Sequence, residues 1–113
     1  MHEYSIVTSL LDLCEENAKK ENAEKITQVE VKIGVLSGVE PYLLESAFET
    51  FKEGTICENA EFVMNMQEVV LYCEDCKEEF EVKEHEMKCP QCKGTKVNVV
   101  DGNDMYLMRL EME

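Results

Sequence analysis

The sequence contains no Trp, only four Tyr and four Phe, and few basic residues. Its 11 Lys and Arg stand against 25 Asp and Glu, which gives a formal net charge of −14 at pH 7. Proteins that bind nucleic acids need clustered Lys and Arg to displace counterions, and many of them stack bases on aromatic rings. Anionic membranes attract basic segments for a similar electrostatic reason. The composition therefore argues against a nucleic-acid partner and against a membrane surface.

The sequence also lacks any apolar run close to the ~20 residues of a membrane-spanning helix. No basic segment followed by an apolar stretch opens it, so we see no signal-peptide pattern. It contains no internal repeat, low-complexity tract or Gly/Ser linker, and 44% of its 113 residues are hydrophobic, which is enough for a globular core. These features predict a soluble, cytoplasmic protein with one domain, or with one domain that carries a small subdomain.

Hydrophobic periodicity in the first third of the chain predicts a helix followed by a strand. Apolar residues from Ile6 to Ala18 recur at helical spacing, and the helix is expected to end near Asn22. Glu3 lies early in it and Lys19-Lys20 lie late, as the helix dipole prefers. Residues 29–35 then alternate between apolar and polar side chains, which is typical of a half-buried strand.

A second helix is expected from Pro41, a favourable first helical residue, with Gly54 as its stop. Its buried stripe is expected to consist of Leu43, Leu44, Ala47, Phe48 and Phe51. Alternation predicts an extended run over residues 62–71 and a last strand over residues 105–112, after the turn Asp101-Gly102-Asn103. This order predicts an α+β fold in which two helices pack on a small antiparallel sheet.

The six cysteines fall into two classes by spacing. Cys14 and Cys57 stand alone and are expected to be small buried hydrophobic side chains. The others form two C-x-x-C pairs separated by twelve residues: Cys73 with Cys76, and Cys89 with Cys92. Each pair can form a tight turn that aims two thiolates at one point, and two such turns complete a tetrahedron around zinc.

Zinc is favoured over two other uses of these cysteines. Three disulfides would need a secretory context that the sequence lacks, and a thioredoxin-like dithiol would use a single pair at the start of a helix. Between the first and last paired cysteines the sizeable apolar residues are only Phe80, Val82 and Met87. They cannot offset an ordering cost of ~1–2 kcal/mol per residue, whereas zinc contributes on the order of 10–16 kcal/mol in small peptides.

The resulting fold prediction is an α+β domain with an inserted zinc-ribbon-like module of four cysteines. The boundaries are residues 1–70 with 101–113 for the α+β domain, and residues 71–100 for the zinc domain. Four cysteinates leave no open coordination position, so the zinc is expected to be structural. His85 lies between the pairs and can in principle replace a cysteine, but a solvent-exposed loop histidine is the simpler interpretation.

The amino terminus offers a second set of metal ligands. His2 is too large a neighbour for removal of the initiator residue, so Met1 is expected to keep its α-amine. That amine, the backbone nitrogen and imidazole of His2, and a backbone nitrogen or carboxylate of Glu3 can close chelate rings on one metal. A planar, nitrogen-rich set of this kind selects Ni(II) or Cu(II) over zinc. The alternative is a frayed terminus whose second residue happens to be histidine, and spacing alone leaves both open.

Motifs along the whole chain carry a resemblance to a known family. They are Met1-His2-Glu3-Tyr4-Ser5, Lys32-Ile33-Gly34, Ser46-Ala47-Phe48-Glu49, the two cysteine pairs and Gly102-Asn103-Asp104-Met105. In order and in total length the chain resembles the nickel metallochaperones of hydrogenase maturation, the HypA/HybF family. The resemblance implies that Ni(II) is a transient cargo, delivered to the [NiFe]-hydrogenase large subunit together with a nickel-binding maturation GTPase.

The resemblance also assigns roles to residues. It implies His2 as the essential nickel ligand, assisted by Glu3. It implies four zinc ligands: Cys73, Cys76, Cys89 and Cys92. Glu40 stands about where relatives carry an acidic residue near the nickel region, but it is not ranked as a ligand. Urease accessory proteins are further candidate partners, and both a monomer and a homodimer remain open.

Two other function classes compete with a metallochaperone. A zinc-ribbon adaptor in a protein or nucleic-acid complex would have no nickel role, and the charge of −14 predicts no binding to nucleic acid. An enzyme is disfavoured because the sequence has no Ser/His/Asp or Cys/His set, no phosphate-binding Gly loop and no open metal site.

Overall fold

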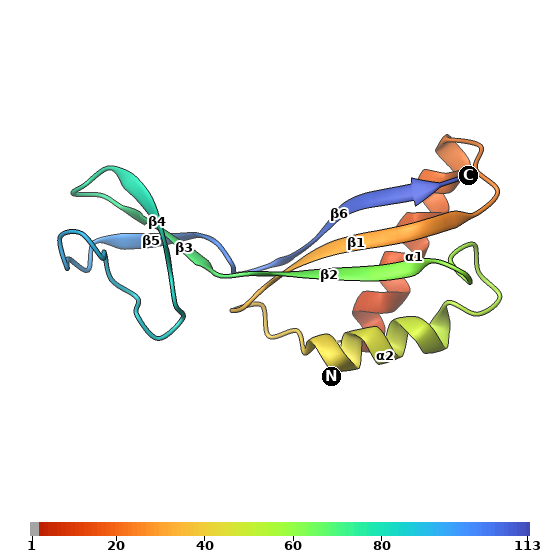
Figure 1. Cartoon of the computed structure of the whole chain (residues 1–113), viewed down its shortest axis with the longest axis horizontal. Helices are drawn as coiled ribbons and strands as arrows, with labels where there is room; N and C mark the ends of the chain where they lie inside the picture. Colours follow the sequence, from red (N-terminus) through yellow and green to blue (C-terminus); the bar gives the residue numbers. More distant parts are fainter. Residues whose placement is uncertain (1–2) are drawn as a thin grey trace. The chain divides into compact units, whose positions relative to one another are not determined.

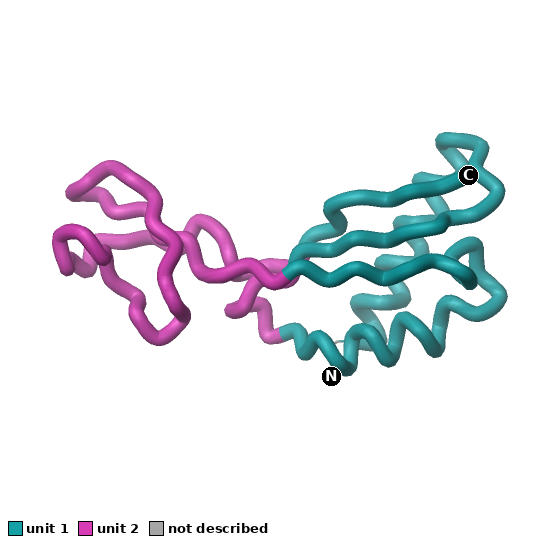
Figure 2. Tube along the Cα trace, viewed as in Figure 1, with its two compact units in different colours: residues 1–32, 39–65, 106–113 teal, residues 33–38, 66–105 magenta. Residues whose placement is uncertain are grey.

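The computed structural model describes residues 3–113, which form two compact units. The first unit takes the described residues up to Lys32, residues 39–65 and residues 106–113, and the second takes residues 33–38 and 66–105 (Figure 2). Within these residues the helices are α1 (Glu3–Lys20) and α2 (Pro41–Phe51), and the strands are β1 (Ile26–Gly34), β2 (Glu61–Gln67), β3 (Val69–Cys73), β4 (Glu78–Val82), β5 (Val97–Asp101) and β6 (Met105–Met112) (Figure 1).

The two helices and a three-stranded sheet form the core of the first unit. Helix α1 buries residues at helical spacing, among them Val7, Leu11 and Cys14. Helix α2 begins with Pro41 at its first position, where the missing N–H costs nothing. Strand β1 lies at the centre of the sheet in the order β2-β1-β6, and α2 packs on β2 through stacked rings of Phe48 and Phe62, 4.3 Å apart.

The second unit has its own three-stranded sheet, in the order β4-β3-β5. Strand β3 is antiparallel to both neighbours, so that Leu71 faces Phe80 on β4 and Val99 on β5. The hydrophobic cluster of this sheet has three buried residues, Val69, Leu71 and Val82. Because this core is so small, the sheet alone offers little apolar burial to hold the unit together.

The α+β prediction is confirmed, with both helices and the first and last strands where periodicity placed them. Cys14 and Cys57 are fully buried, as expected of small hydrophobic side chains. In the described part of the chain, no helix is both long enough and apolar enough to cross a membrane. The metal-binding domain boundaries at residues 70 and 101 stay a prediction.

Three details of the prediction were wrong. The extended run over residues 62–71 is two strands in different sheets, β2 and β3, interrupted at Glu68. Strands β4 and β5 within the cysteine module were not foreseen, because alternation over five residues is a weak signal. Leu43 and Phe51, assigned to the buried stripe of the second helix, are 51% and 42% exposed. Only a narrower stripe of α2, which includes Leu44 and Phe48, is buried.

A close approach of two glycines fixes the backbone of the second unit where β1 ends. The N–H of Gly34 donates to the carbonyl of Asp104 at 2.9 Å, and that of Leu36 donates to the carbonyl of Gly102 at 2.8 Å. A Cβ added to Gly34 would collide with the carbonyl group of Gly102 and lie 2.8 Å from the nitrogen of Asn103. The obstacle is backbone, so no side-chain rotation can relieve it.

We expect Gly34→Ala to lower the free energy of unfolding by about 3 kcal/mol or more, because the crossing must separate to admit a methyl group. Gly38→Ala is the matched control, since Gly38 has φ of 79° but a Cβ added there would meet no atom within 4 Å. Gly38→Ala should lower the free energy of unfolding by only about 1 kcal/mol, because the only penalty is alanine in a left-handed backbone. Urea denaturation followed by circular dichroism measures both, and equal losses in the two variants would contradict the packing argument.

Candidate metal centres

Two tight turns of the same geometry present the four paired cysteines. In the first, Cys73 ends β3 and its carbonyl accepts a hydrogen bond from the N–H of Lys77, which has φ of 57°. In the second, the carbonyl of Cys89 accepts from the N–H of Lys93, which has φ of 63°. In both turns this hydrogen bond joins residues four apart in the sequence, and the last residue has a left-handed backbone. The two C-x-x-C motifs therefore fold alike.

Backbone N–H groups point at the sulfurs in both turns. The N–H of Cys76 donates to Sγ of Cys73, and the N–H of Cys92 donates to Sγ of Cys89, each at 3.4 Å. The N–H of Gly94 donates to Sγ of Cys92, also at 3.4 Å. These bonds orient three of the four cysteine side chains within the turns.

The four sulfurs all lie within 4.8 Å of one another. The Sγ atoms of Cys73 and Cys92 are 3.7 Å apart, and those of Cys76 and Cys89 are 3.8 Å apart. A tetrahedron with zinc–sulfur bonds of about 2.3 Å places its sulfurs about 3.8 Å apart. The cluster therefore has the dimensions of a closed zinc site, and these residues fit the metal.

The sulfurs of Cys76 and Cys89 differ in how readily they ionise. Burial raises the pKa of Cys76 to about 12, whereas the N–H of Cys92 lowers the pKa of Cys89 to about 7. Charge is thus favoured on one sulfur and opposed on its near neighbour. A divalent cation at the centre would stabilise thiolates at all four positions.

His85 lies apart from the four-sulfur group. Its side chain is 75% exposed, and its Nε2 lies 3.5 Å from a carboxylate oxygen of Glu86. It is a solvent-exposed loop histidine, which was the simpler of the two interpretations.

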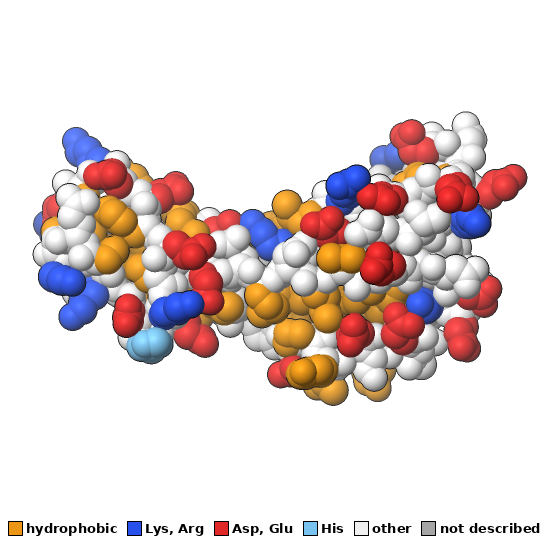
Figure 3. Space-filling view, in the orientation of Figure 1, with side chains coloured by type: hydrophobic (Ala, Val, Ile, Leu, Met, Phe, Trp, Pro, Cys, Tyr) orange, Lys and Arg blue, Asp and Glu red, His pale blue; other side chains and the backbone are white. Residues whose placement is uncertain are grey.

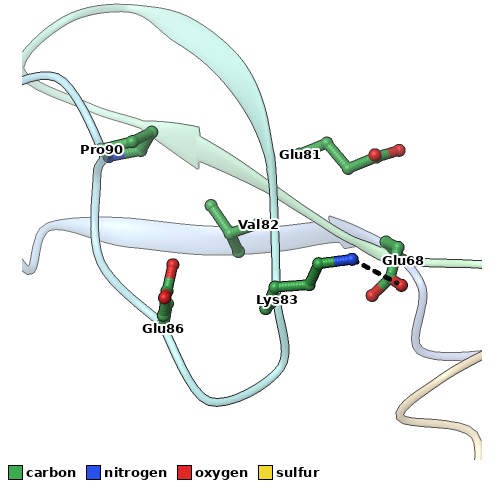
Figure 4. A pocket seen from close by; sticks show the side chains of 6 residues that line it. All are labelled: Glu68, Glu81, Val82, Lys83, Glu86 and Pro90. Carbon is green, nitrogen blue, oxygen red and sulfur yellow. Dashed lines mark hydrogen bonds and ion pairs between the residues drawn. The ribbon is translucent and has the colours of Figure 1, made fainter.

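A polar hollow of about 160 Å³ in the second unit lies beside β4 and the segment that follows it (Figure 4). Glu68, Glu81, Lys83 and Glu86 contribute charged side chains to its lining. Nζ of Lys83 lies 3.3 Å from Oε2 of Glu68, and both side chains reach solvent. An exposed pair of this kind contributes about 0–1 kcal/mol to stability, and the hollow presents no nucleophile.

The proposed nickel ligands stand at the start of the first unit. His2 lies outside the described residues. Glu3 is the first residue of α1 and is only 5% exposed. Its Oε2 accepts a hydrogen bond from the backbone N–H of Glu40 at 2.9 Å. The Glu3 carboxylate therefore lies at the amino-terminal ends of both helices, where the helix dipoles favour negative charge.

The structure brings Glu40 to Glu3 through its backbone, a contact that sequence reasoning missed. The side chain of Glu40 caps α2, with Oε1 accepting from the N–H of Tyr42 at 3.3 Å. In the sequence, Pro41 marks the first helical position and so makes Glu40 the capping position. Nothing in the sequence pattern signals that the N–H of the capping residue bonds a carboxylate 37 positions earlier.

The fold and the four-sulfur cluster define a small α+β protein with a four-cysteine metal-binding site. A family model described as hydrogenase/urease nickel incorporation, metallochaperone, hypA, matches residues 1–112. The chain therefore belongs to the HypA family of nickel metallochaperones and hydrogenase maturation factors. This assignment does not favour the zinc-ribbon adaptor.

Individual relatives and solved structures agree. The hydrogenase maturation factor HypA of Shewanella sp. (strain MR-7) is 54% identical over 113 residues, which cover all of this chain and 96% of that protein. The corresponding protein of Aquifex aeolicus (strain VF5) is 51% identical over all of this chain and 98% of its own length. The solution structure of the Ni metallochaperone HypA from Helicobacter pylori has 43% identity and a TM-score of 0.74, and covers 99% of this chain and 97% of that one.

We expect Cys92→Ser to lower the zinc content of the purified protein from about one ion per chain towards zero, because the tetrahedral set loses a thiolate. Cys14→Ala is the control, since it also removes a cysteine, but one whose sulfur does not belong to the cluster of four. Metal analysis by plasma mass spectrometry, with zinc-depleted buffers, measures both. Full zinc retention in Cys92→Ser would contradict a four-cysteine site.

We expect Glu3→Ala to lower the free energy of unfolding by about 1–3 kcal/mol, because the N–H of Glu40 loses its acceptor in a partly buried place. Glu3→Gln should retain most of the stability, since its amide oxygen can accept the same bond. Thermal and urea denaturation compare the two. A glutamine variant as unstable as the alanine variant would show that charge at the helix ends, and not the hydrogen bond, dominates.

Proposed function

We propose that this chain binds Ni(II) through its amino terminus and delivers it to the large subunit of [NiFe]-hydrogenase, in cooperation with a nickel-binding maturation GTPase. The observation that supports this most is the nickel-metallochaperone family match over residues 1–112, together with the Met-His-Glu start. The family description names urease as well as hydrogenase, so urease accessory proteins are also candidate partners. The role proposed is carriage of a metal ion, without a catalytic step.

His2 is the essential nickel ligand in this proposal, with the backbone nitrogens of the first residues completing a planar set. The environment of Glu3 bears on how it takes part. Its carboxylate already accepts the N–H of Glu40, and binding a metal through the same oxygen would weaken that bond. Use of the backbone nitrogen of Glu3 leaves the bond intact, because the first N–H groups of a helix have no intrahelical acceptor.

The four cysteines would hold Zn(II) as a permanent structural ion. Two of their sulfur separations, 3.7 and 3.8 Å, match those of a closed tetrahedron, and four thiolates leave no position for a substrate or for water. A site of this kind retains its ion. The two proposed metal centres therefore serve different ends, since a cargo ion must be released and a structural ion must stay.

We expect His2→Ala to abolish stoichiometric nickel binding and to leave the zinc in place, because the imidazole is the side-chain ligand of the set. His85→Ala is the matched control, since it removes the other histidine of the chain and should leave nickel binding unchanged. Native mass spectrometry and calorimetric titration of untagged protein measure both metals.

The pH dependence gives a second check in the same experiment. Protons compete with nickel for imidazole and amine nitrogens, so the affinity should fall as the pH decreases through about 7.7 and 6.5, the reference pKa values of the amine and the imidazole. Nickel retained by His2→Ala, or an affinity that does not change between about pH 8 and pH 6, would overturn the amino-terminal site.

A further inference from the structure

Helix α2 and the first turn of α1 carry large apolar side chains that the fold does not bury. Tyr42 is 82% exposed, Tyr4 57%, Leu43 51% and Phe51 42%. Figure 3 shows hydrophobic side chains gathered over α2, with acidic side chains beside them. Clustered exposure of this kind is typical of a surface that another molecule covers, unlike single scattered apolar residues. We call these four residues the α2 patch.

The α2 patch is shaped as well as apolar. The rings of Tyr4 and Phe51 meet edge to face with centroids 5.4 Å apart, which joins the first turn of α1 to the end of α2. A hollow of about 260 Å³ lies beside them, lined by Glu3, Tyr4, Leu43 and Ser46. A hollow of that volume can receive a large apolar side chain. Pockets that receive an anchoring side chain are where protein interfaces concentrate their binding energy.

The border of the α2 patch is negative. Exposed carboxylates on or next to α2 belong to Glu40, Glu45, Glu49 and Glu53. Nearby Lys52 offsets only Glu49, because its Nζ lies 2.8 Å from that carboxylate and also donates to the carbonyl of Ala60. The border therefore keeps an excess of negative charge. The chain as a whole carries −14, so the local border has the same sign as the long-range field.

Charge selects the occupant. A second copy of this chain, docked about a twofold axis, would place the same carboxylate-bordered patch on both sides of the interface. Nucleic acids and anionic membranes are repelled by this border. The complementary surface is that of a different protein, with an apolar side chain for the hollow and Lys or Arg around it.

We propose that the α2 patch is the docking surface for the protein that exchanges nickel with this chain, a partner with a basic border around an apolar anchor. The proposal rests on the proposed function, because Glu3 lines the hollow and directly follows His2 in the chain. A partner seated there lies beside the first residues of α1, so its own ligands can reach the cargo.

The test uses the full chain and the two proposed protein partners, the maturation GTPase and the hydrogenase large subunit, each purified separately. The double variant Tyr42→Ala/Leu43→Ala should weaken binding of at least one of them about tenfold or more, since anchoring residues dominate such interfaces. Both side chains are more than half exposed, so the fold should be retained. Met108→Ala is the matched control, since Met108 is 54% exposed on β6, and it should change the affinity less than about twofold.

The carboxylates that border the α2 patch are tested separately, through the rate of association. Glu45→Gln/Glu49→Gln should slow association at low salt by about tenfold, with a smaller effect at high salt, because border charges act mainly on the encounter rate. Stopped-flow or surface-based kinetics at two salt concentrations measure this. Affinity and rate unchanged in both double variants would overturn the docking surface, as would a wild-type chain that binds neither protein.

Two further measurements keep this proposal separate from the nickel function. Binding is measured without nickel, and nickel affinity is measured on the isolated double variants, where it should be unchanged. Loss of nickel binding in Tyr42→Ala/Leu43→Ala would overturn the docking assignment in favour of a role in the metal site. Sedimentation that shows a dimer dispersed by the same variant would identify a second copy as the occupant and overturn it as well. Nickel retained by His2→Ala would instead remove the proposed function, whatever the docking affinities.

Discussion

The convergence of four sulfurs is the constraint on which the second unit depends. The hydrophobic cluster of its sheet has only three buried residues, Val69, Leu71 and Val82, supported by a few half-buried neighbours. A core of that size cannot offset the conformational entropy of the rest of the unit, residues 33–38 and 66–105, at roughly 1–2 kcal/mol for each ordered residue. A metal coordinated at the ends of the two hydrogen-bonded turns would supply what the apolar side chains lack. Sheet and cluster also share a residue, because Cys73 is both the end of β3 and a member of the four.

The first unit depends on ordinary packing, and its distinctive feature is polar. Glu3 is a charged side chain with 5% exposure, which would be costly without compensation. The N–H of Glu40 and the dipoles of two helix starts provide that compensation. One carboxylate thus ties the beginning of α1 to the beginning of α2.

Sequence reasoning recovered the helices and the central strand because each has a strong period and a clear boundary. Asn22, expected near the end of the first helix, takes the left-handed backbone at φ of 56°, and Pro41 opens the second helix. The cysteine spacing was equally informative, since C-x-x-C fixes how near two sulfurs must come. Helix boundaries and cysteine spacing involve residues close together in the sequence, so the sequence pattern is enough to predict them.

Strands β4 and β5 were missed because alternation over five residues is too short to indicate a strand, whereas the other missed features are properties of distant neighbours. Alternation through residues 62–71 cannot reveal that the chain changes sheets at Glu68, because both halves alternate equally well. Apolar spacing on α2 does not say how much of the stripe the sheet covers, so Leu43 and Phe51 were assigned to the core and lie at the surface. That error is informative. Where a helix carries more apolar side chains than its own fold buries, the surplus marks a surface suited to another molecule.

The two sets of proposed ligands meet opposite physical demands. The cysteines lie in two internal turns, each fixed by backbone hydrogen bonds, so all four sulfurs are preorganised and an ion bound there has no easy route of exchange. The proposed ligands at the chain end are few, so an incoming protein can supply further donors before the old bonds break. Transfer of this kind needs the receiver to be held close while the ion changes ligands. An apolar surface bordered by carboxylates, beside the first turn of α1, meets that need by attracting a basic partner over long range and anchoring it over short range.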